Sequence, residues 1–533
     1  MSAGTVLDLL AAWAELTPDK KCWTFLNDKG EITDQYTYKE LDRITTSLAS
    51  YLLNACDLKA GDRALLVFFP GLDFTITLLA CFKAGVIAVP VFPPDPSKLA
   101  KDLHHFVSIQ QSSESKVALT HSIYNFAKKI SGIKNIFSSR GESWPDLKWK
   151  SVDDVIRASK SKSTGKSPSI PPAPPRSEIA FLQYTSGSTS EPKGVMITHG
   201  NLAHNEAMII RELRADQNTV CVSWLPQYHD MGLIGSYLGL LYCGGTGYYI
   251  SPISFLKDPM LWIRCLSKYN GTHTQAPNFA FALVTRKFKE CPEQNLQLSQ
   301  LQHMLNAAEP VDDIAIKEFY EIFAQFGLPR KVVVPTYGLA EHTVFVCSGG
   351  RQRIIVNKAA LEENRVEVVS ESTLDDFDYS PAQASQGYQT IVGCGYPKNG
   401  DNVQVIIVNI DTNEVLREDM VGEIWVTSLS KAAGYWNKPA VTTEEFHAQP
   451  SGGTYAADGF LRTGDLGFMH RDELFICGRS KDLIIVRGSN HYPQDIERTA
   501  EKADKRIREG CIAAFAVHNS QAHTESVVLG INT

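Results

Sequence analysis

Short apolar runs alternate with helix-patterned segments between residues 36 and 93, and this alternation constrains the fold more than any other feature. The segments 38–53 and 73–84 have the periodicity of amphipathic helices, and the runs 63–70 and 86–92 have the length of buried strands. This order predicts βαβ units, in which helices cover both faces of a parallel sheet. We therefore expect an α/β (mixed) fold with doubly wound sheets.

The composition changes twice further along the chain. Residues 159–177 are rich in Ser, Lys and Pro, which predicts an extended, solvated linker without a core of its own. The apolar run 179–184 follows at once and leads into a polar loop that contains glycine. The later runs 403–408, 422–426 and 474–476 are short and apolar, and they predict a β-rich subdomain.

Charge and cysteine usage exclude several classes of function. The 533 residues carry 52 Lys+Arg against 59 Asp+Glu, a net charge of −7, and have no long basic run. Such a chain lacks the basic face that non-specific nucleic-acid binding needs. The 11 cysteines form no Cys-x-x-Cys pair, so neither a zinc site nor a dithiol redox pair is indicated. Scattered thiols fit a reducing compartment, and we expect a cytoplasmic protein.

Two apolar segments raise the question of membrane insertion. The N-terminal residues 1–16 include Asp8 and show helical spacing, which predicts an amphipathic helix and not a signal peptide. No charge falls between Asp230 and Lys257, but glycines interrupt this stretch. A buried helix, a glycine turn and a buried strand fit that punctuation better than a transmembrane helix. We expect no integral membrane segment.

The segment 184–196 is the most informative part of the sequence. Small residues let backbone N–H groups curve around a polyanion, while hydroxyls and Lys193 add donors and charge. The spacing differs from a Walker A loop, in which Ser or Thr follows the lysine; here Gly194 does. A flexible surface loop is the plain alternative. The predicted strand 179–184 before the loop, and the apolar run 195–197 and the predicted helix after it, favour a phosphate loop. Its polar and glycine residues are Thr185, Ser186, Gly187, Ser188, Thr189, Ser190, Lys193 and Gly194.

This loop resembles the phosphate-binding motif of the acyl-adenylate-forming superfamily, which includes acyl-CoA ligases, luciferase and peptide-synthetase adenylation domains. Further motifs of that superfamily follow in the same order and cover most of the chain. They are similar to its acyl-site, adenine, magnesium, ribose and hinge motifs, and lie at residues 225–232, 306–310, 335–341, 462–467 and 478–488.

Within the superfamily, the sequence resembles the fatty acyl-AMP ligases more than the CoA ligases. The segments 251–259, 276–281 and 90–96 match that branch. The spacer between Glu341 and Val392 is also longer than CoA ligases usually carry, and residues 351–378 resemble the branch's insertion, which hinders the domain rotation that CoA thioesterification needs. An ordinary variable loop is the alternative for this spacer.

The resemblance implies an ATP site in which the loop and Lys193 hold the β- and γ-phosphates and Glu341 holds Mg²⁺, since hard cations prefer carboxylate and phosphate oxygens. The expected catalytic residues are Lys193, His229 and Glu341. The expected ATP- and AMP-binding residues are Thr185, Ser186, Gly187, Ser188, Thr189, Lys193, Asn306, Ala307, Ala308, Glu309, Thr336, Tyr337, Gly338, Leu339, Asp465 and Arg479.

Several of these residues have plain structural alternatives. Tyr337 would stack on adenine, or it is a buried core tyrosine. Asp465 would accept two hydrogen bonds from the ribose diol, or it is a turn residue. Arg479 would reach ribose or phosphate, or it is a solvated surface charge. Lys481 stands where the superfamily has its hinge residue.

The resemblance also implies an acyl site. His229 would border the reacting carboxylate, although a lone histidine is more often structural. An apolar tunnel would hold the fatty tail, with core packing an equal alternative for its wall residues. The expected pocket consists of His229, Gly232, Ile234, Phe279 and Ala280.

The implied organisation is a large N-terminal adenylation domain, 1–478, followed by the start of a small α+β C-terminal domain, 479–533. The superfamily's C-terminal lysine motif is not found before Thr533, so we expect a truncated C-terminal domain. The implied reaction converts a medium- or long-chain fatty acid and ATP, with Mg²⁺, into fatty acyl-AMP and pyrophosphate. The acyl group would pass to an acyl carrier protein or a polyketide-synthase carrier domain.

Three other functions are alternatives to a fatty acyl-AMP ligase. A fatty acyl-CoA ligase is the nearest alternative, separated by CoA-dependent AMP release. A peptide-synthetase adenylation domain would read an amino group with an Asp near the acyl site, whereas 276–283 has none. A non-catalytic acyl-adenylate binder or sensor would bind nucleotide without exchanging pyrophosphate.

Overall fold

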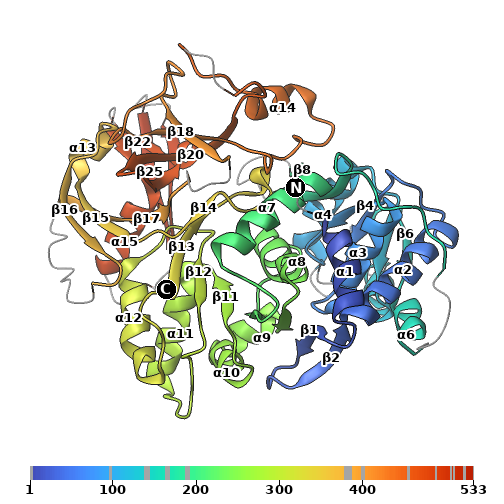
Figure 1. The fold of residues 1–533 in the computed structure, drawn as a ribbon. Helices are drawn as coiled ribbons and strands as arrows, with labels where there is room; N and C mark the ends of the chain where they lie inside the picture. Colours follow the sequence, from blue (N-terminus) through green and yellow to red (C-terminus); the bar gives the residue numbers. More distant parts are fainter. Residues whose placement is uncertain are drawn as a thin grey trace.

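The structure is a computed structural model that describes residues 4–94, 99–136, 144–161, 168–185, 192–376, 387–397, 402–452, 456–486, 489–503, 507, 511–519 and 524–531. Within these ranges two mostly parallel sheets lie beside each other, with the β-rich part next to them (Figure 1). This confirms the expected α/β class with doubly wound sheets and a β-rich subdomain.

The first of the parallel sheets has six strands in the part of the chain described. All neighbours pair in parallel except the last two. In spatial order they are β6 (Lys148–Ser151), β5 (Val117–Thr120), β3 (Arg63–Leu66), β4 (Ile87–Pro90), β7 (Ile179–Thr185) and β8 (Lys193–Thr198).

The second has eight described strands, with antiparallel pairs only at its two edges. In spatial order they are β14 (Cys347–Ser348), β13 (Val333–Tyr337), β12 (His303–Asn306), β11 (His273–Ala276), β9 (Val220–Ser223), β10 (Thr246–Tyr249), β1 (Lys21–Leu26) and β2 (Ile32–Thr37).

The β-rich part is an antiparallel sheet of seven described strands. They are β16 (Val368–Thr373), β15 (Gln352–Asn357), β17 (Tyr388–Gly395), β21 (Glu473–Arg479), β20 (Leu461–His470), β19 (Gly422–Thr427) and β18 (Gln404–Val408). Two hairpins follow towards the C-terminus. They are β22 (Ile484–Val486) with β23 (Ser489–His491), and β24 (Ile512–Asn519) with β25 (Thr524–Ile531).

The helices connect and cover these sheets. They are α1 (Val6–Leu16), α2 (Tyr38–Asn54), α3 (Leu72–Ala84), α4 (Leu99–Ser113), α5 (Ser122–Ile136), α6 (Asp153–Ser161), α7 (His199–Glu212), α8 (Gly239–Cys243), α9 (Pro252–Lys257), α10 (Met260–Lys268), α11 (Asn278–Glu290), α12 (Asp313–Phe323), α13 (Lys358–Glu362), α14 (Pro439–Phe446) and α15 (Pro493–Ala503). Short helices of other types are the π-helix η1 (Met231–Leu238) and the 3₁₀ turns η2 (Ala324–Phe326), η3 (Ala340–His342) and η5 (Ser480–Asp482).

The uncharged stretch after Asp230 folds as its glycine punctuation predicts. It forms η1 and α8, turns at Gly244 with φ +76°, and continues as β10. The N-terminal helix is also confirmed, and Asp8 has a local role because it completes a capping box with Thr5. No helix in the described part of the chain is long and apolar enough to cross a membrane.

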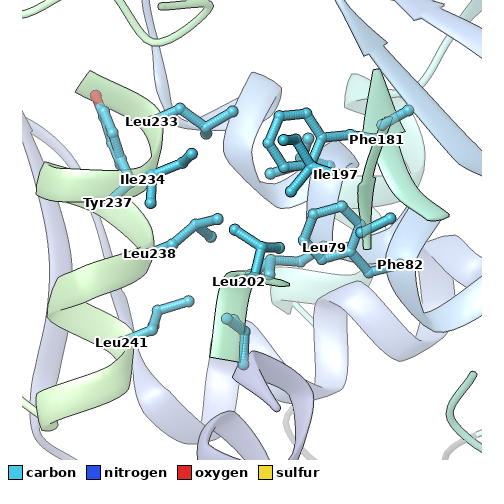
Figure 2. Close-up of a cluster of buried hydrophobic side chains, with 14 of the residues drawn as sticks. Leu79, Phe82, Phe181, Ile197, Leu202, Leu233, Ile234, Tyr237, Leu238 and Leu241 are labelled. Atoms are coloured by element: carbon cyan, nitrogen blue, oxygen red, sulfur yellow. The ribbon is translucent and has the colours of Figure 1, made fainter. Parts of the chain in front are cut away.

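A hydrophobic core joins the two parallel sheets through the helices packed between them (Figure 2). Side chains of α3, β7 and β8 meet those of α7, η1 and α8 there. The labelled residues are Leu79, Phe82, Phe181, Ile197, Leu202, Leu233, Ile234, Tyr237, Leu238 and Leu241. The core therefore fixes η1 against the six-stranded sheet, and η1 borders the site described below.

One buried carboxyl, that of Glu206, is expected to make the stability of the chain depend on pH. Glu206 is fully buried, neither oxygen has a hydrogen-bond partner among the described residues, and burial raises its pKa well above the usual value. Glu206 is neutral in the folded chain and ionised in the unfolded chain. The free energy of unfolding therefore falls as the pH rises above the ordinary pKa of a glutamate. Glu206→Gln is expected to be more stable than the parent at pH 8, by about 1–3 kcal/mol, and similar near pH 4.

Thermal unfolding at several pH values checks this expectation. The difference in apparent Tm between the parent and Glu206→Gln should widen from pH 4 to pH 8. Glu15→Gln, the same change at an exposed position on α1, serves as the control and should show no such trend. An equal Tm difference at every pH contradicts the assignment of a neutral Glu206.

Candidate active site

The three sheets meet at a cavity of about 530 Å³. The six-stranded sheet contributes Gln183 and Lys193, the eight-stranded sheet Thr336, and the seven-stranded sheet Glu423 and Asp465. Its lining includes polar and charged side chains and also a set of mostly apolar residues from α7, η1, β11, β12 and the segment 344–345, which we call the apolar arm. The cavity thus combines a site for a charged group with one for a hydrocarbon.

The expected phosphate loop joins β7 to β8. Thr185 and Lys193 are paired across these antiparallel strands, and both line the cavity. The Lys193 Nζ lies 2.8 Å from Glu445 Oε1 and 4.6 Å from the centre of the Tyr435 ring. The loop residues Ser186, Gly187, Ser188 and Thr189 lie outside the described residues.

Glu341 lines the cavity from η3, the turn that follows β13. Burial raises the pKa of its carboxyl above the usual value, while the Tyr435 hydroxyl, 3.0 Å from Oε1, opposes that shift. The same hydroxyl lies 3.0 Å from Glu445 Oε2. One hydroxyl proton serves one acceptor at a time, so the two carboxyls compete for it.

The donor set at Glu341 fits a magnesium ion shared with a nucleotide. Mg²⁺ in proteins commonly takes one or two carboxylates together with substrate phosphate oxygens. No group of three metal-binding side chains occurs in the described ranges, so a cage made wholly of protein is not seen there. Glu341 faces the same cavity as Lys193, where such phosphates would lie.

Asp465 is held on three sides. Tyr337 donates its hydroxyl proton to Asp465 Oδ2 at 2.6 Å, and Arg479 Nε lies 3.4 Å from Oδ1. Its backbone N–H donates to Thr463 Oγ1 at 3.0 Å. Burial raises the pKa of Asp465, and the Tyr337 hydroxyl and the Arg479 guanidinium oppose this rise. The carboxylate is therefore fixed at the cavity wall with lone pairs left to accept from a ligand.

Tyr337 itself lies differently from the stacking position expected of it. It is 8% exposed, belongs to the hydrophobic core and does not line the cavity, whereas Thr336, Gly338 and Leu339 do. Its hydroxyl group orients Asp465 instead. Gly338 faces the Val344 carbonyl so closely that a Cβ would lie 1.7 Å from the oxygen, which excludes any side chain there.

The expected adenine motif is split by the fold. Ala307 and Ala308 line the cavity, with Ala308 in the left-handed region at φ 74°. Asn306 is buried and donates to Asn278 Oδ1 at 2.9 Å, while Glu309 accepts from the Phe279 backbone N–H. The two outer residues thus hold the loop, and the two inner ones face the cavity.

His229 also lines the cavity. Its Nδ1 lies 2.7 Å from Asp230 Oδ1, and this carboxylate raises the pKa of the imidazole. Arg479 and Lys481 also line the cavity, at the end of β21 and in η5.

The other four residues expected in the acyl pocket do not line this cavity. Gly232 is needed for backbone packing, because a Cβ there would lie 2.3 Å from the Pro226 carbonyl oxygen. Ile234 points into the core shared with the six-stranded sheet (Figure 2). Phe279 is 43% exposed beside Trp224, and Ala280 is buried in a second core cluster. The arm is lined instead by Ile209, Leu213, Met231, Gly235, Gln275, Leu305, Val344 and Phe345.

The residues that contact Lys193 and Glu341 were not predictable from any motif. Tyr435 and Glu445 come from the segment leading into α14 and from α14 itself, far along the chain from either partner. Arg462 opens the expected ribose motif, and its guanidinium lies 3.0 Å from Glu423 Oε2 at the cavity wall. The motif 462–467 was the only sequence signal for Arg462, and Glu423 lies outside that motif, in β19.

Comparison with known proteins places this site in a family. A family model described as AMP-binding enzyme matches residues 10–436. The chain is 38% identical over 518 residues to the medium-chain-fatty-acid–acyl-carrier-protein ligase JamA of Moorena producens (strain JHB), covering 96% of this chain and 83% of that protein. It is 33% identical over 540 residues to the medium-chain-fatty-acid–acyl-carrier-protein ligase TtuA of Teredinibacter turnerae, covering 94% and 80%.

A solved structure agrees. The fatty acyl-adenylate ligase from L. pneumophila, in complex with acyl adenylate and pyrophosphate, aligns with a TM-score of 0.78 and 34% identity, covering 99% of this chain and 86% of that chain.

Proposed function

The chain belongs to the AMP-binding enzyme family, and from that premise we propose that it activates a fatty acid with ATP to form fatty acyl-AMP and pyrophosphate. One observation carries the proposal: Lys193, Glu341 and Asp465 line the same cavity as the residues of the apolar arm. The similarity to fatty-acid ligases and to a fatty acyl-adenylate ligase supports the same reaction.

In this reaction a carboxylate oxygen attacks the α-phosphorus and pyrophosphate leaves, so catalysis consists mainly of positioning and charge neutralisation. Lys193 would pair with phosphate oxygens in place of Glu445, and Asp465 would accept from the ribose hydroxyls. His229 would donate a hydrogen bond to the reacting carboxylate at the mouth of the arm. Mg²⁺, bound by Glu341 and the nucleotide phosphates, would neutralise phosphate charge.

We propose an acyl carrier protein as the acceptor, as in the names of two relatives. The ladder β15–β16 and helix α13, which fall within the insertion expected at 351–378, support this choice. Buried Arg353 lies 3.8 Å from Asp313 of α12, and Asp375 of the insertion lies 3.7 Å from Lys331 outside it. These contacts fix the insertion to the large domain.

The same insertion contacts the C-terminal segment. Lys358 Nζ lies 3.7 Å from Asp495 Oδ2, and Glu362 Oε1 lies 3.1 Å from His491 Nδ1. These pairs would restrain the rotation that CoA thioesterification requires. Because β15 pairs with both β16 and β17, deleting 351–378 would remove part of the sheet, and point substitutions are the better test.

Breaking these two ion pairs is expected to raise CoA use. Ion pairs near the protein surface contribute at most about 1 kcal/mol each, so the double variant Lys358→Ala/Glu362→Ala should raise CoA-dependent AMP release by about two- to fivefold. The control Lys39→Ala/Glu178→Ala removes charges that are exposed elsewhere. Equal CoA use in all three proteins would contradict a restraint by α13.

A cytoplasmic location is part of the proposal. All 11 cysteines are free thiols, and most are buried, as expected in a reducing compartment. Fatty-acid-dependent exchange of pyrophosphate into ATP tests the proposed reaction. Exchange only when a fatty acid and Mg²⁺ are present supports it, and exchange with an amino acid but no fatty acid refutes it.

A further inference from the structure

A second, smaller cavity lies against the apolar arm, because the two cavities share lining residues, which we call the wall. This inner cavity measures about 30 Å³, against about 530 Å³ for the main cavity. The wall residues line both spaces, and they are Ile209, Leu213, Gly235, Gln275 and Leu305. Of these, Gln275 alone has a polar side chain. Behind the wall the inner cavity continues between α7, α8 and β9.

Gln275 is held in place by a chain of hydrogen bonds. Its Nε2 donates to Ser236 Oγ at 2.5 Å, and Ser236 Oγ donates to Ser223 Oγ at 3.0 Å. The side chain is 6% exposed, and a buried amide held in this way loses its hydrogen bonds if it swings aside. The carboxamide is therefore a fixed part of the wall.

Gly235 brings the π-helix η1 against this carboxamide. A Cβ at position 235 would lie 2.7 Å from Gln275 Oε1 and 2.9 Å from Nε2. The glycine thus leaves just enough room for the amide, and any added side chain would push it towards the arm. The Gln275 carboxamide is thus held both by steric contact with Gly235 and by its hydrogen bond to Ser236.

We propose that Gln275, held by Ser236 against Gly235, closes the acyl arm and restricts the substrate to medium-chain fatty acids. This inference rests on the proposed function. A longer chain would have to displace the carboxamide and break its hydrogen bond to Ser236 before the end of the chain could enter the inner cavity. Removing the carboxamide joins the two cavities and admits longer chains.

The test compares kcat/KM for acyl-AMP formation from octanoate, dodecanoate and hexadecanoate. The parent should use hexadecanoate at least about tenfold less well than dodecanoate, and Gln275→Ala should raise the hexadecanoate-to-octanoate ratio about tenfold. Gly235→Ala should lower the dodecanoate-to-octanoate ratio. Gln275→Leu refills the space without the hydrogen bond and should keep the parent's ranking. Gln110→Ala, which removes an amide far from the cavity, is the control.

Binding of the same acids, measured by calorimetry, separates this inference from the proposed function. If the acids bind with the predicted ranking in parent and variants but no acyl-AMP forms, the chain-length gate stands and the proposed function fails. If acyl-AMP forms but Gln275→Ala leaves the chain-length ratio unchanged, the gate is wrong and the function stands. A parent that uses or binds hexadecanoate as well as octanoate also overturns the gate.

Discussion

Glu341→Gln is expected to lower fatty acyl-AMP formation by about a hundred- to a thousandfold. The substitution keeps the size of the side chain and a carbonyl oxygen near the Tyr435 hydroxyl, but removes the charge that would bind Mg²⁺ beside the phosphates. Loss of one preorganised charge-stabilising group at a reaction centre has this order of effect. The measurement is kcat/KM for acyl-AMP over a range of Mg²⁺ concentrations.

The dependence on Mg²⁺ distinguishes this role from a structural one. Glu341→Gln should need more Mg²⁺ for half-maximal rate, and its apparent Tm should stay close to that of the parent. Glu178→Gln, the same change at an exposed position outside the cavity, should leave both quantities unchanged. A variant that is fully active at the parent's Mg²⁺ requirement would exclude Glu341 as the metal ligand.

Asp465→Ala is expected to weaken the use of ATP by about a hundredfold. A hydrogen bond to a charged group contributes about 1.5–3 kcal/mol, and the two ribose hydroxyls would lose such an acceptor. The effect should fall mainly on the KM for ATP, because the ribose is remote from the reacting phosphorus. Steady-state kinetics with varied ATP at saturating fatty acid give this value.

The contact between Tyr337 and Asp465 allows a graded version of this test. Tyr337→Phe removes only the hydroxyl that holds Asp465, so the KM for ATP should rise by about tenfold, less than in Asp465→Ala. The exposed turn variant Asp411→Ala is the control. Equal losses in Tyr337→Phe and Asp465→Ala would contradict a role of the Tyr337 hydroxyl that is limited to orienting Asp465.

The elements of the fold could be predicted from the sequence because their patterns are local. The run 179–184 became β7 and the helical segment 73–84 became α3. Glycine punctuation also separated η1, α8 and β10 correctly from a membrane span. The π-helical form of η1 was not predictable, since apolar spacing over eight residues does not distinguish it from an α-helix.

The site was less predictable where it depends on the direction of a side chain. Motifs placed Lys193, Glu341 and Asp465 at the cavity, but no local pattern tells whether Tyr337 faces a ligand or the core. Glu445 joins the site through α14, distant in sequence from its partner Lys193.

The acyl arm was the least predictable part. Apolar residues line tunnels and fill cores alike, so Ile234 and Ala280 could not be assigned to one or the other. Gln275 was not predicted either, because the polar residues His273 and Thr274 precede it in the same buried strand β11 and no local pattern shows which of the three lines the arm.

Product analysis is the most direct test of fatty acyl-AMP formation by this chain. The chain is incubated with ATP, Mg²⁺ and dodecanoate, with and without CoA, and the products are separated. We expect acyl-AMP and pyrophosphate to accumulate, with little change when CoA is added. Conversion of the acid to acyl-CoA would contradict the proposed acceptor, and bound nucleotide without any acyl-AMP would contradict the proposed reaction itself.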